Sequence, residues 1–419
     1  HRGLQRLSYA RLREMLFTSN TTPRQGIALG ADSLRFFSRP EWRRDSIVFI
    51  PFIANNIPAS PTSEEVDAIR RAVSYNRDVF QSIAATWAAT LPASAGTKEA
   101  LAVSLEMRGD PAAIDTLRSA RRLTSDPNHR VRLASQEALL LFKFGFPNDH
   151  AALRRVRVES DSLLSIKAPA SLESARALSS LAALTGKCAA VAELKRRIAQ
   201  PRSDVVDAPR QVVAEWDAVE AKAALGCQST RTSSFVEVNA SIWSAQVKGA
   251  AAQRRAAAPL VLGRAVLLTF PLDSAWVARL SSPRSGGVLQ AAHAILVGEH
   301  EAARRHLEIS LTALLPGEIT PDAIYPRARL WLMLADTSTS VQLLDRVLRD
   351  VRFLSPGLLD SPVQIGALVR VAMLRAEIAA NRGDSQKAAL LSTAVMDLWS
   401  GADPDLSPSL RAVSRFARQ

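Results

Sequence analysis

The two cysteines are the residues of this sequence with the clearest chemical meaning. Cys188 and Cys227 each follow a glycine, Gly186 and Gly226, that ends a helix predicted from the apolar pattern. First helices of adjacent helix pairs stack about 10 Å apart, and their crossing can bring their ends closer. A disulfide needs Cα atoms within about 7 Å. We therefore expect a Cys188–Cys227 disulfide, which would indicate an oxidising compartment such as the periplasm. The alternative is two buried free thiols in a cytosolic protein.

The histidines and serines do not form a recognisable catalytic or metal site. A zinc-protease helix needs histidines at i and i+4, but His300 is followed by Arg304 at the second position. His306 faces another direction, and we interpret the six histidines as ordinary surface residues. No Gly-x-Ser-x-Gly nucleophile turn occurs, and the glycine pair 286–287 lacks the Lys-Ser/Thr of a phosphate-binding loop. We predict no catalytic residue, no metal and no cofactor, and hence a protein that is not an enzyme.

The composition indicates a helical, basic protein. The chain has 419 residues, of which 47% are hydrophobic, 22% charged and only 5% aromatic, with a net charge of +13. Strands favour aromatic and β-branched residues, so this mixture favours helices. The arginines are scattered in pairs and no aromatic residues interleave with them in sequence, which argues against nucleic acid. The charge instead favours protein partners with acidic surfaces, and a basic nucleic-acid-binding helical protein is a further alternative.

The helices that would position the cysteines are separated by recurring glycine-centred breaks. These glycines lie 77, 40, 72 and 85 residues apart, at Gly109, Gly186, Gly226, Gly298 and Gly383. The intervals are close to one or two multiples of about 36–43 residues, as in helix-turn-helix repeats. Around the first break the pattern predicts helices over 96–107 and 112–123, followed by a third over 128–144.

Four zones follow from this pattern. They are a basic N-terminal segment at 1–61, helical repeats at 62–230, an irregular helical and loop insertion at 231–286, and helical repeats again at 287–419. Within the first zone, residues 46–53 are β-branched and aromatic, which predicts a short extended strand. Pro51 restricts that strand to an edge or covered position.

No stretch of 18 apolar residues is present, so no transmembrane segment is predicted. The longest apolar run, 256–270, is interrupted by Gly263 and Arg264. The first residue is His1 rather than methionine, which suggests that a signal peptide or membrane anchor once preceded it. We expect an extracytoplasmic, periplasmic location, with membrane association through partners or a missing N-terminal anchor. A cytoplasmic location stays open.

Two segments carry a resemblance to a known family. Residues 98–127 run from Lys-Glu-Ala-Leu through Arg-Gly-Asp-Pro to a closing Asp-Pro, with small residues at Ala102, Ala113 and Ala120. The unit at 374–399 and its tail, Leu-Trp-Ser-Gly-Ala-Asp-Pro-Asp-Leu at 398–406, are similar. Both resemble tetratricopeptide (TPR) units, in particular the TPR-bearing C-terminal regions of bacterial eukaryotic-like serine/threonine kinases. The resemblance implies an all-α, degenerate TPR-like helix-pair solenoid.

The motifs of a kinase domain are absent, since the sequence has no Gly-rich loop, His-Arg-Asp or Asp-Phe-Gly. The resemblance therefore implies a non-catalytic scaffold that binds other protein subunits, for example as an accessory architectural subunit of a larger membrane-associated assembly. The alternative is a regulatory or sensory extracytoplasmic domain of a signalling protein.

Overall fold

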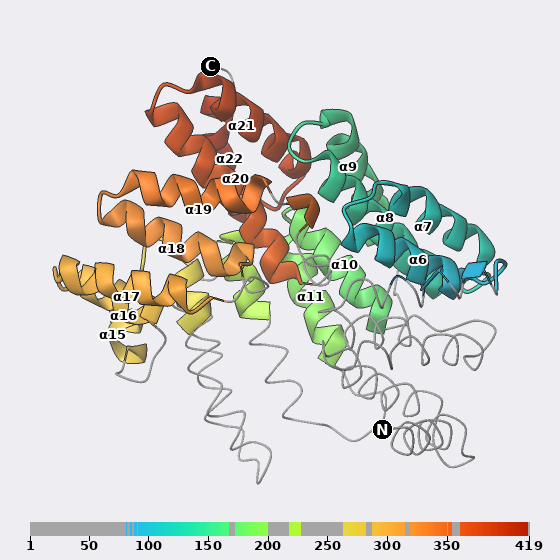
Figure 1. Cartoon of the computed structure of the whole chain (residues 1–419), viewed down its shortest axis with the longest axis horizontal. Helices are drawn as coiled ribbons and strands as arrows, with labels where there is room; N and C mark the ends of the chain where they lie inside the picture. The colour runs from blue at the N-terminus through green and yellow to red at the C-terminus, as the bar shows by residue number, and fades with distance from the viewer. Residues whose placement is uncertain are drawn as a thin grey trace, which may run out of the picture. The chain divides into compact units, whose positions relative to one another are not determined.

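The computed structural model describes residues 91–166, 172–199, 218–227, 263–281, 287–314, 319–349, 351–353 and 361–417, with a few positions between 81 and 89. All regular secondary structure within these ranges is helical, and they contain no strand (Figure 1). The predicted strand at 46–53, and with it the whole N-terminal zone 1–61, lies outside the described residues. The composition therefore correctly indicated an all-α protein.

The chain divides into two compact units, His1–Leu140 and Leu141–Gln419. The described helices of the first unit are α6 (Ala95–Met107), α7 (Ala112–Leu123) and most of α8 (Pro127–Gly145), which continues into the second unit. The sequence-based prediction of three helices in this region is confirmed, because each predicted end agrees with the structure to within one residue.

The second unit contains the remaining helices. They are α9 (His150–Leu164), α10 (Leu172–Leu184), α11 (Cys188–Ala199), α15 (Ser274–Leu280), α16 (Gly287–Leu296), α17 (His300–Thr312), α18 (Pro321–Met333), α19 (Thr337–Arg349), α20 (Pro362–Asn381), α21 (Ser385–Trp399) and α22 (Ser407–Phe416). Two short 3-10 helices, η4 (Val351–Phe353) and η6 (Pro404–Leu406), and two further helical stretches at 218–225 and 263–268 complete the described part. The predicted insertion at 231–286 thus contains regular helix where it is described.

Six helix ends in the described part of the chain share one turn geometry. In each, the residue at the turn has a positive φ between 60° and 83°. The turns are centred on Gly109, Gly186, Gly226, Gly298, Ala335 and Gly383. The N–H of the turn residue donates to the carbonyl of the residue three positions earlier. The N–H of the next residue donates to the carbonyl five positions earlier, as in Lys187 N to Ala182 O at 2.8 Å. This is the Schellman arrangement, which satisfies the last carbonyls of a helix and reverses the chain.

Glycine populates this left-handed region without steric cost, which explains the five glycine positions. Ala335 adopts it at φ 60° without being a glycine. It lies 37 residues after Gly298 and 48 before Gly383, so it divides the longest of the intervals between glycine breaks. The repeat is therefore more regular in the structure than the glycines alone indicate.

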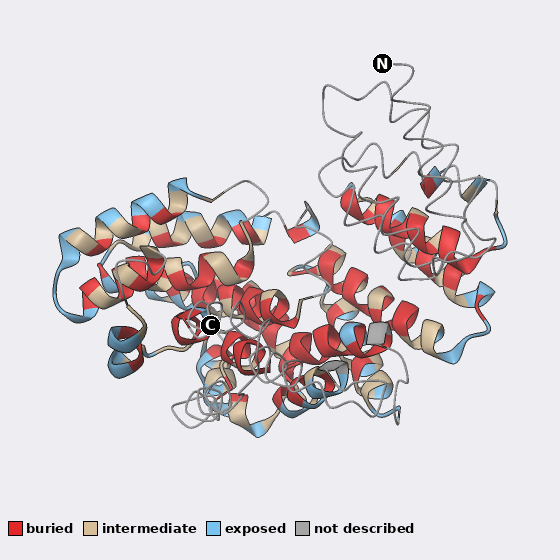
Figure 2. Cartoon of the chain, turned by 90° about the horizontal axis from the view of Figure 1, so that it is seen from below, coloured by how far each residue is buried: buried red, intermediate tan, exposed pale blue. Residues whose placement is uncertain are grey.

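Helices that follow one another pack as pairs. The pairs are α6 with α7, α10 with α11, α16 with α17, α18 with α19, and α20 with α21. The first helices of the later pairs pack in succession, because α18 contacts both α16 and α20. These first helices are the more deeply buried members, whereas α19 buries only Ser340, Leu344 and Val347 (Figure 2).

The second unit also joins helices that are distant in sequence. α10 packs against α20, and α9 packs against α21. In an open solenoid each repeat contacts only its neighbours. The second unit departs from that arrangement, because the last helix pair is covered by helices from its beginning. A free groove along the first helices is consequently absent at α20, which also contacts α18, α19, α21 and α22.

Within the part of the chain that the structure describes, no helix is long and apolar enough to cross a membrane.

Candidate functional site at the disulfide-linked turns

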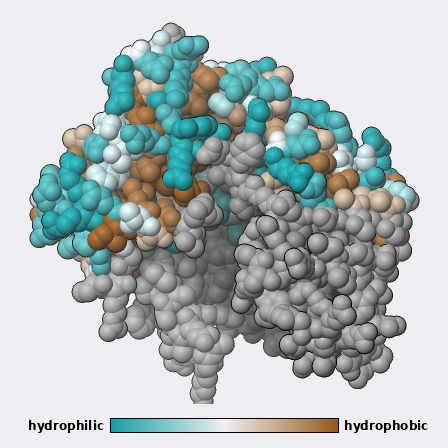
Figure 3. All heavy atoms as spheres, viewed as in Figure 1, coloured by the Kyte–Doolittle hydropathy of each residue, from teal (hydrophilic) through white to brown (hydrophobic). Residues whose placement is uncertain are grey.

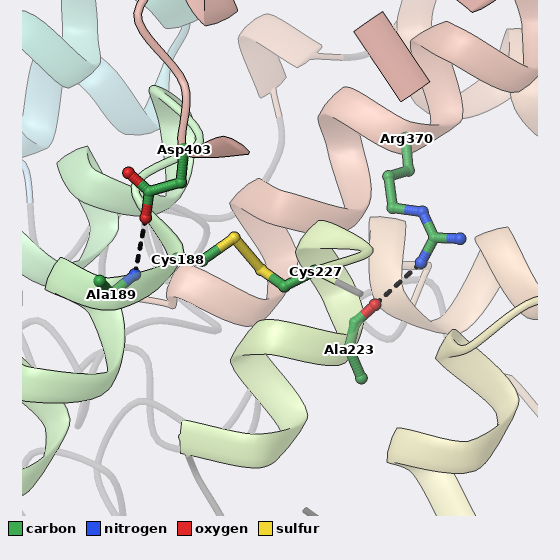
Figure 4. The surroundings of a disulfide bond; sticks show 6 residues. All are labelled: Cys188, Ala189, Ala223, Cys227, Arg370 and Asp403. Carbon is green, nitrogen blue, oxygen red and sulfur yellow. Dashed lines mark hydrogen bonds between the residues drawn. A yellow bond between two sulfur atoms is a disulfide. The ribbon is translucent and has the colours of Figure 1, made fainter. Parts of the chain in front are cut away.

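The structure joins Cys188 and Cys227 in a disulfide, with 6.3 Å between their Cα atoms and a sequence separation of 39. Cys188 opens α11, and Cys227 follows the 218–225 helix. Both cysteines are buried. Cys188 directly follows the Gly186 turn and Cys227 is the last residue of the Gly226 turn, so the bond connects two turns of the helical repeat (Figure 4).

The turn before Cys188 is attached to the C-terminal part of the chain. The indole Nε1 of Trp399 donates to the carbonyl of Leu184 at 3.1 Å, and Trp399 is fully buried. The backbone N–H of Asp403 donates to the carbonyl of Gly186 at 3.0 Å. The Asp403 carboxylate in turn accepts the N–H of Ala189 at 2.9 Å, near the start of α11. This carboxylate lies where the positive end of a helix dipole favours negative charge.

Space around this turn is limited. A Cβ atom at Gly186 would lie 2.7 Å from the Cβ of Ala402 and 3.0 Å from Cδ1 of Leu406. Lys187 extends over the same surface, where its Nζ donates to the carbonyl of Gly401 and pairs with Asp161 of α9 at 3.0 Å. The Gly186 turn therefore requires a glycine for two reasons, its positive φ and the close approach of the 399–406 segment.

The turn before Cys227 is attached to α20. Gly366 contacts Leu225 so closely that an added Cβ would lie 3.1 Å from Cγ of that leucine and 3.2 Å from its backbone nitrogen. One turn further along α20, the Arg370 guanidinium donates to the carbonyl of Ala223 at 2.8 Å (Figure 4). The disulfide thus lies between two contacts, one from α20 and one from the segment after α21.

Arg370 connects four elements. Besides Ala223, its guanidinium donates to the carbonyl of Leu268, at the end of the 263–268 helix, and to the hydroxyl of Tyr325 in α18. The two carbonyls belong to helix C-termini, where a cation is favoured by the helix dipole. Burial, the largest cause, lowers the pKa of Arg370, and the like charge of Arg329 lowers it further.

A salt-bridge pair connects three of the same elements. Arg264 of the 263–268 helix pairs with Glu220 at 2.9 Å and with Asp322 of α18 at 2.6 Å. The 218–225 and 263–268 helices are therefore held together by Arg264 at one point and by Arg370 at another. These helices border the residues 228–262 that the structure does not describe.

A second buried ionic cluster lies in the first unit. Glu99 of α6 is completely buried and pairs with Arg132 and His129 of α8. Burial lowers the pKa of His129, although Asp126 acts in the opposite direction. A neutral ring fits the contacts, with Nε2–H donating to Glu99 at 3.0 Å and Nδ1 accepting from Thr124 at 3.2 Å. Because every charge has a partner inside these helices, the cluster acts as a polar core rather than an open site.

Two of the histidines are not ordinary surface residues, contrary to our interpretation of the sequence. The His129 side chain is only 16% exposed, and His150 pairs with Asp397 of α21 at 2.9 Å. Sequence patterns could not reveal either contact, because each partner lies on another helix. Among the described residues no group of three or more His, Cys, Asp or Glu side chains could hold a metal ion.

The residues that hold the disulfide turns in place were not identified from sequence. Trp399 and Asp403 lie in the tail at 398–406 that carried the family resemblance, but their contacts with the Gly186 turn span more than two hundred residues. Arg370 is one of many arginines, and no spacing distinguishes it. No protein-family model matches the chain, and no curated protein matches it significantly in sequence.

Proposed function

We propose that this chain is a non-catalytic scaffold that binds other proteins outside the cytoplasm. The observation that supports this most is the series of described helix pairs, in each of which a Schellman turn joins the two helices. Arrays of helix pairs present extended surfaces that suit binding to a peptide or to another subunit. The arrangement of side chains around the turns serves packing, since Trp399, Asp403 and Arg370 are all engaged in contacts within the chain.

The surface available to a partner lies on the second helices of the pairs and at the turns. α17 buries only Ala303, Leu307 and Ser310, and its Ile309 is 64% exposed. Val297 at the preceding turn is 55% exposed. On the face shown in Figure 3, hydrophilic and hydrophobic areas alternate over the described residues. Scattered apolar positions on a charged surface suit a subunit interface with a polar rim.

The location outside the cytoplasm rests on the disulfide. Disulfides persist in oxidising compartments and are reduced in most cytosolic proteins. The bond lies in the core of the second unit and not at a mobile surface loop, because both cysteines are at most 3% exposed. Such a position suits a permanent structural bond rather than a transient catalytic one.

Affinity purification tests the proposal. The tagged protein is purified from membranes and soluble fractions of its own source, and the co-purified proteins are identified by mass spectrometry. We expect one or a few proteins in constant proportion to the chain, retained at moderate salt. Recovery of the chain alone from every fraction would contradict the scaffold function.

A further inference from the structure

In the second unit, neither Arg329 nor Arg370 has a carboxylate partner among the described residues. Arg370 uses its hydrogen bonds on carbonyls and a hydroxyl, and Arg329 of α18 makes its closest recorded contact with the ring of Phe270. Neighbouring Arg264, by contrast, is paired with both Glu220 and Asp322. The two acids of this region are thus already engaged, which leaves an excess of positive charge at Arg329 and Arg370.

Each of the two guanidinium groups contacts one ring of an aromatic pair. Phe270 and Tyr325 meet edge to face, with 6.1 Å between ring centroids. The Cζ of Arg370 lies 4.3 Å from the Tyr325 centroid, and the Cζ of Arg329 lies 4.8 Å from that of Phe270. Cation–π contacts stabilise each guanidinium but do not neutralise its charge. After burial, the like charge of Arg329 also lowers the pKa of Arg370, so the two guanidinium charges repel each other.

Each guanidinium keeps hydrogen-bond donors for a ligand. Arg370 donates through Nη1 to two carbonyls and through Nη2 to Tyr325, so its Nε–H and one Nη2–H stay available. The side chain of Arg329 makes no hydrogen bond to any of the described residues. Arg329, Arg370 and Phe270 are half-buried, and the contacts around Arg370 shield its guanidinium from solvent. Both arginines therefore keep hydrogen-bond donors that no described residue uses, and neither side chain is fully enclosed.

We propose that Arg329 and Arg370 form a binding site for a carboxylate side chain of an acidic protein partner. The inference rests on the proposed scaffold function and names the chemistry of the partner. Guanidinium groups bind carboxylates in a planar, bidentate geometry that an ammonium group cannot reproduce. A nucleic acid fits less well, because Tyr325 is only 4% exposed and both rings already carry a guanidinium. At most one face of each ring is therefore without a guanidinium and open to stacking by a base.

The experiment measures binding of a fluorescein-labelled ten-residue Glu-rich peptide by anisotropy, with a Gln-rich peptide of the same length as reference. Arg329→Gln is the test variant, because the Arg329 side chain makes no hydrogen bond to any residue that the structure describes. Arg329→Lys keeps the charge but removes the planar fork. Arg346→Gln is the matched control, since Arg346 is exposed on α19 and its loss changes the net charge equally. Thermal melts verify that all variants are folded.

We expect the Glu-rich peptide to bind the intact chain. Arg329→Gln should raise the dissociation constant of this peptide about tenfold, because one partner of a charge pair is lost. Arg329→Lys should lie between these values, and Arg346→Gln should stay within about twofold of the intact chain. Equal effects of Arg329→Gln and Arg346→Gln, or no measurable peptide binding, would overturn the site. Preferential binding of a single-stranded oligonucleotide with the same dependence on Arg329 would overturn the choice of ligand.

The peptide titration needs no native partner, so the two proposals can fail separately. Peptide binding that depends on Arg329, together with no co-purified protein, would support the carboxylate site and contradict the scaffold function. A stable native complex that is unaffected by Arg329→Gln would keep the scaffold and reject this site.

Discussion

Gly186 and Gly298 have the same backbone conformation in different surroundings. Their φ values are 72° and 83°, and both end the first helix of a pair. A Cβ atom at Gly298 would meet nothing within 4 Å, whereas one at Gly186 would lie 2.7 Å from Cβ of Ala402. The two positions therefore separate the conformational cost of a left-handed turn from the cost of disturbing a packed contact.

We expect Gly298→Ala to cost about 1–2 kcal/mol, the penalty for a side chain in the left-handed region. Gly186→Ala should cost this amount and a further ~1–3 kcal/mol, because the 399–406 segment must move away. Urea unfolding monitored by circular dichroism gives both values. Equal costs for the two variants would show that the segment does not pack on the Gly186 turn.

His129 should make the stability of the first unit sensitive to pH. Burial holds its pKa below the ordinary value of 6.5, so above that pH the ring is neutral in both the folded and unfolded states. As the pH falls below 6.5, the unfolded state takes up the proton first, and stability declines until the folded-state pKa is passed. Urea midpoints between pH 7.5 and 5 measure the decline.

His129→Gln serves as the control for this pH dependence. Glutamine can keep a hydrogen bond to Glu99 but does not titrate. The variant should therefore lose much of the decline between pH 7.5 and 5. An unchanged profile in His129→Gln would assign the pH dependence to other groups.

At the scale of helices, the disulfide and the contacts around it hold the α10–α11 pair and the 218–225 helix in one arrangement. The Cys188–Cys227 bond closes a loop with a separation of 39 residues. Trp399 and Asp403 attach one side of it to the C-terminal segment, and Arg370 attaches the other side to α20. Loss of the bond should therefore loosen α11 and the 218–225 helix before the rest of the unit.

The paired variant Cys188→Ala with Cys227→Ala should be less stable by about 3–4 kcal/mol, the value expected for closing a loop of this length. Hydrogen exchange should show the largest loss of protection in α11 and at 218–225. Peptide mapping of the protein from its own source, without reduction, should recover the two cysteines linked. Free thiols in the native protein would contradict both the structural role and the extracytoplasmic location.

Some of these helices were predictable and some of their contacts were not. The Gly-centred breaks predicted α6 and α7 well, because apolar periodicity and capping are local properties. The Ala335 turn was missed because alanine gives no signal for a left-handed conformation. The arginine pair on Phe270 and Tyr325 was also missed, since the aromatic and basic residues alternate in space but not in sequence.

At the scale of the whole second unit, the main finding is that early and late helices pack together. α10 contacts α20, and α9 contacts α21, where Asp397 bonds to His150 and Arg154. Repeat periodicity predicts contacts between neighbours only, so it could not predict this closure. Because α10 and α9 cover the last helix pair, our proposal places partner binding on the second helices, the turns and the half-buried arginine pair.

The scaffold function is tested most directly by reconstitution. A protein co-purified with the chain is produced separately, mixed with the purified chain, and analysed by size-exclusion chromatography with light scattering. The account predicts a complex of fixed stoichiometry whose mass is the sum of its subunits and which Arg329→Gln weakens more than Arg346→Gln. Failure of every co-purified protein to form such a complex with the purified chain would contradict it.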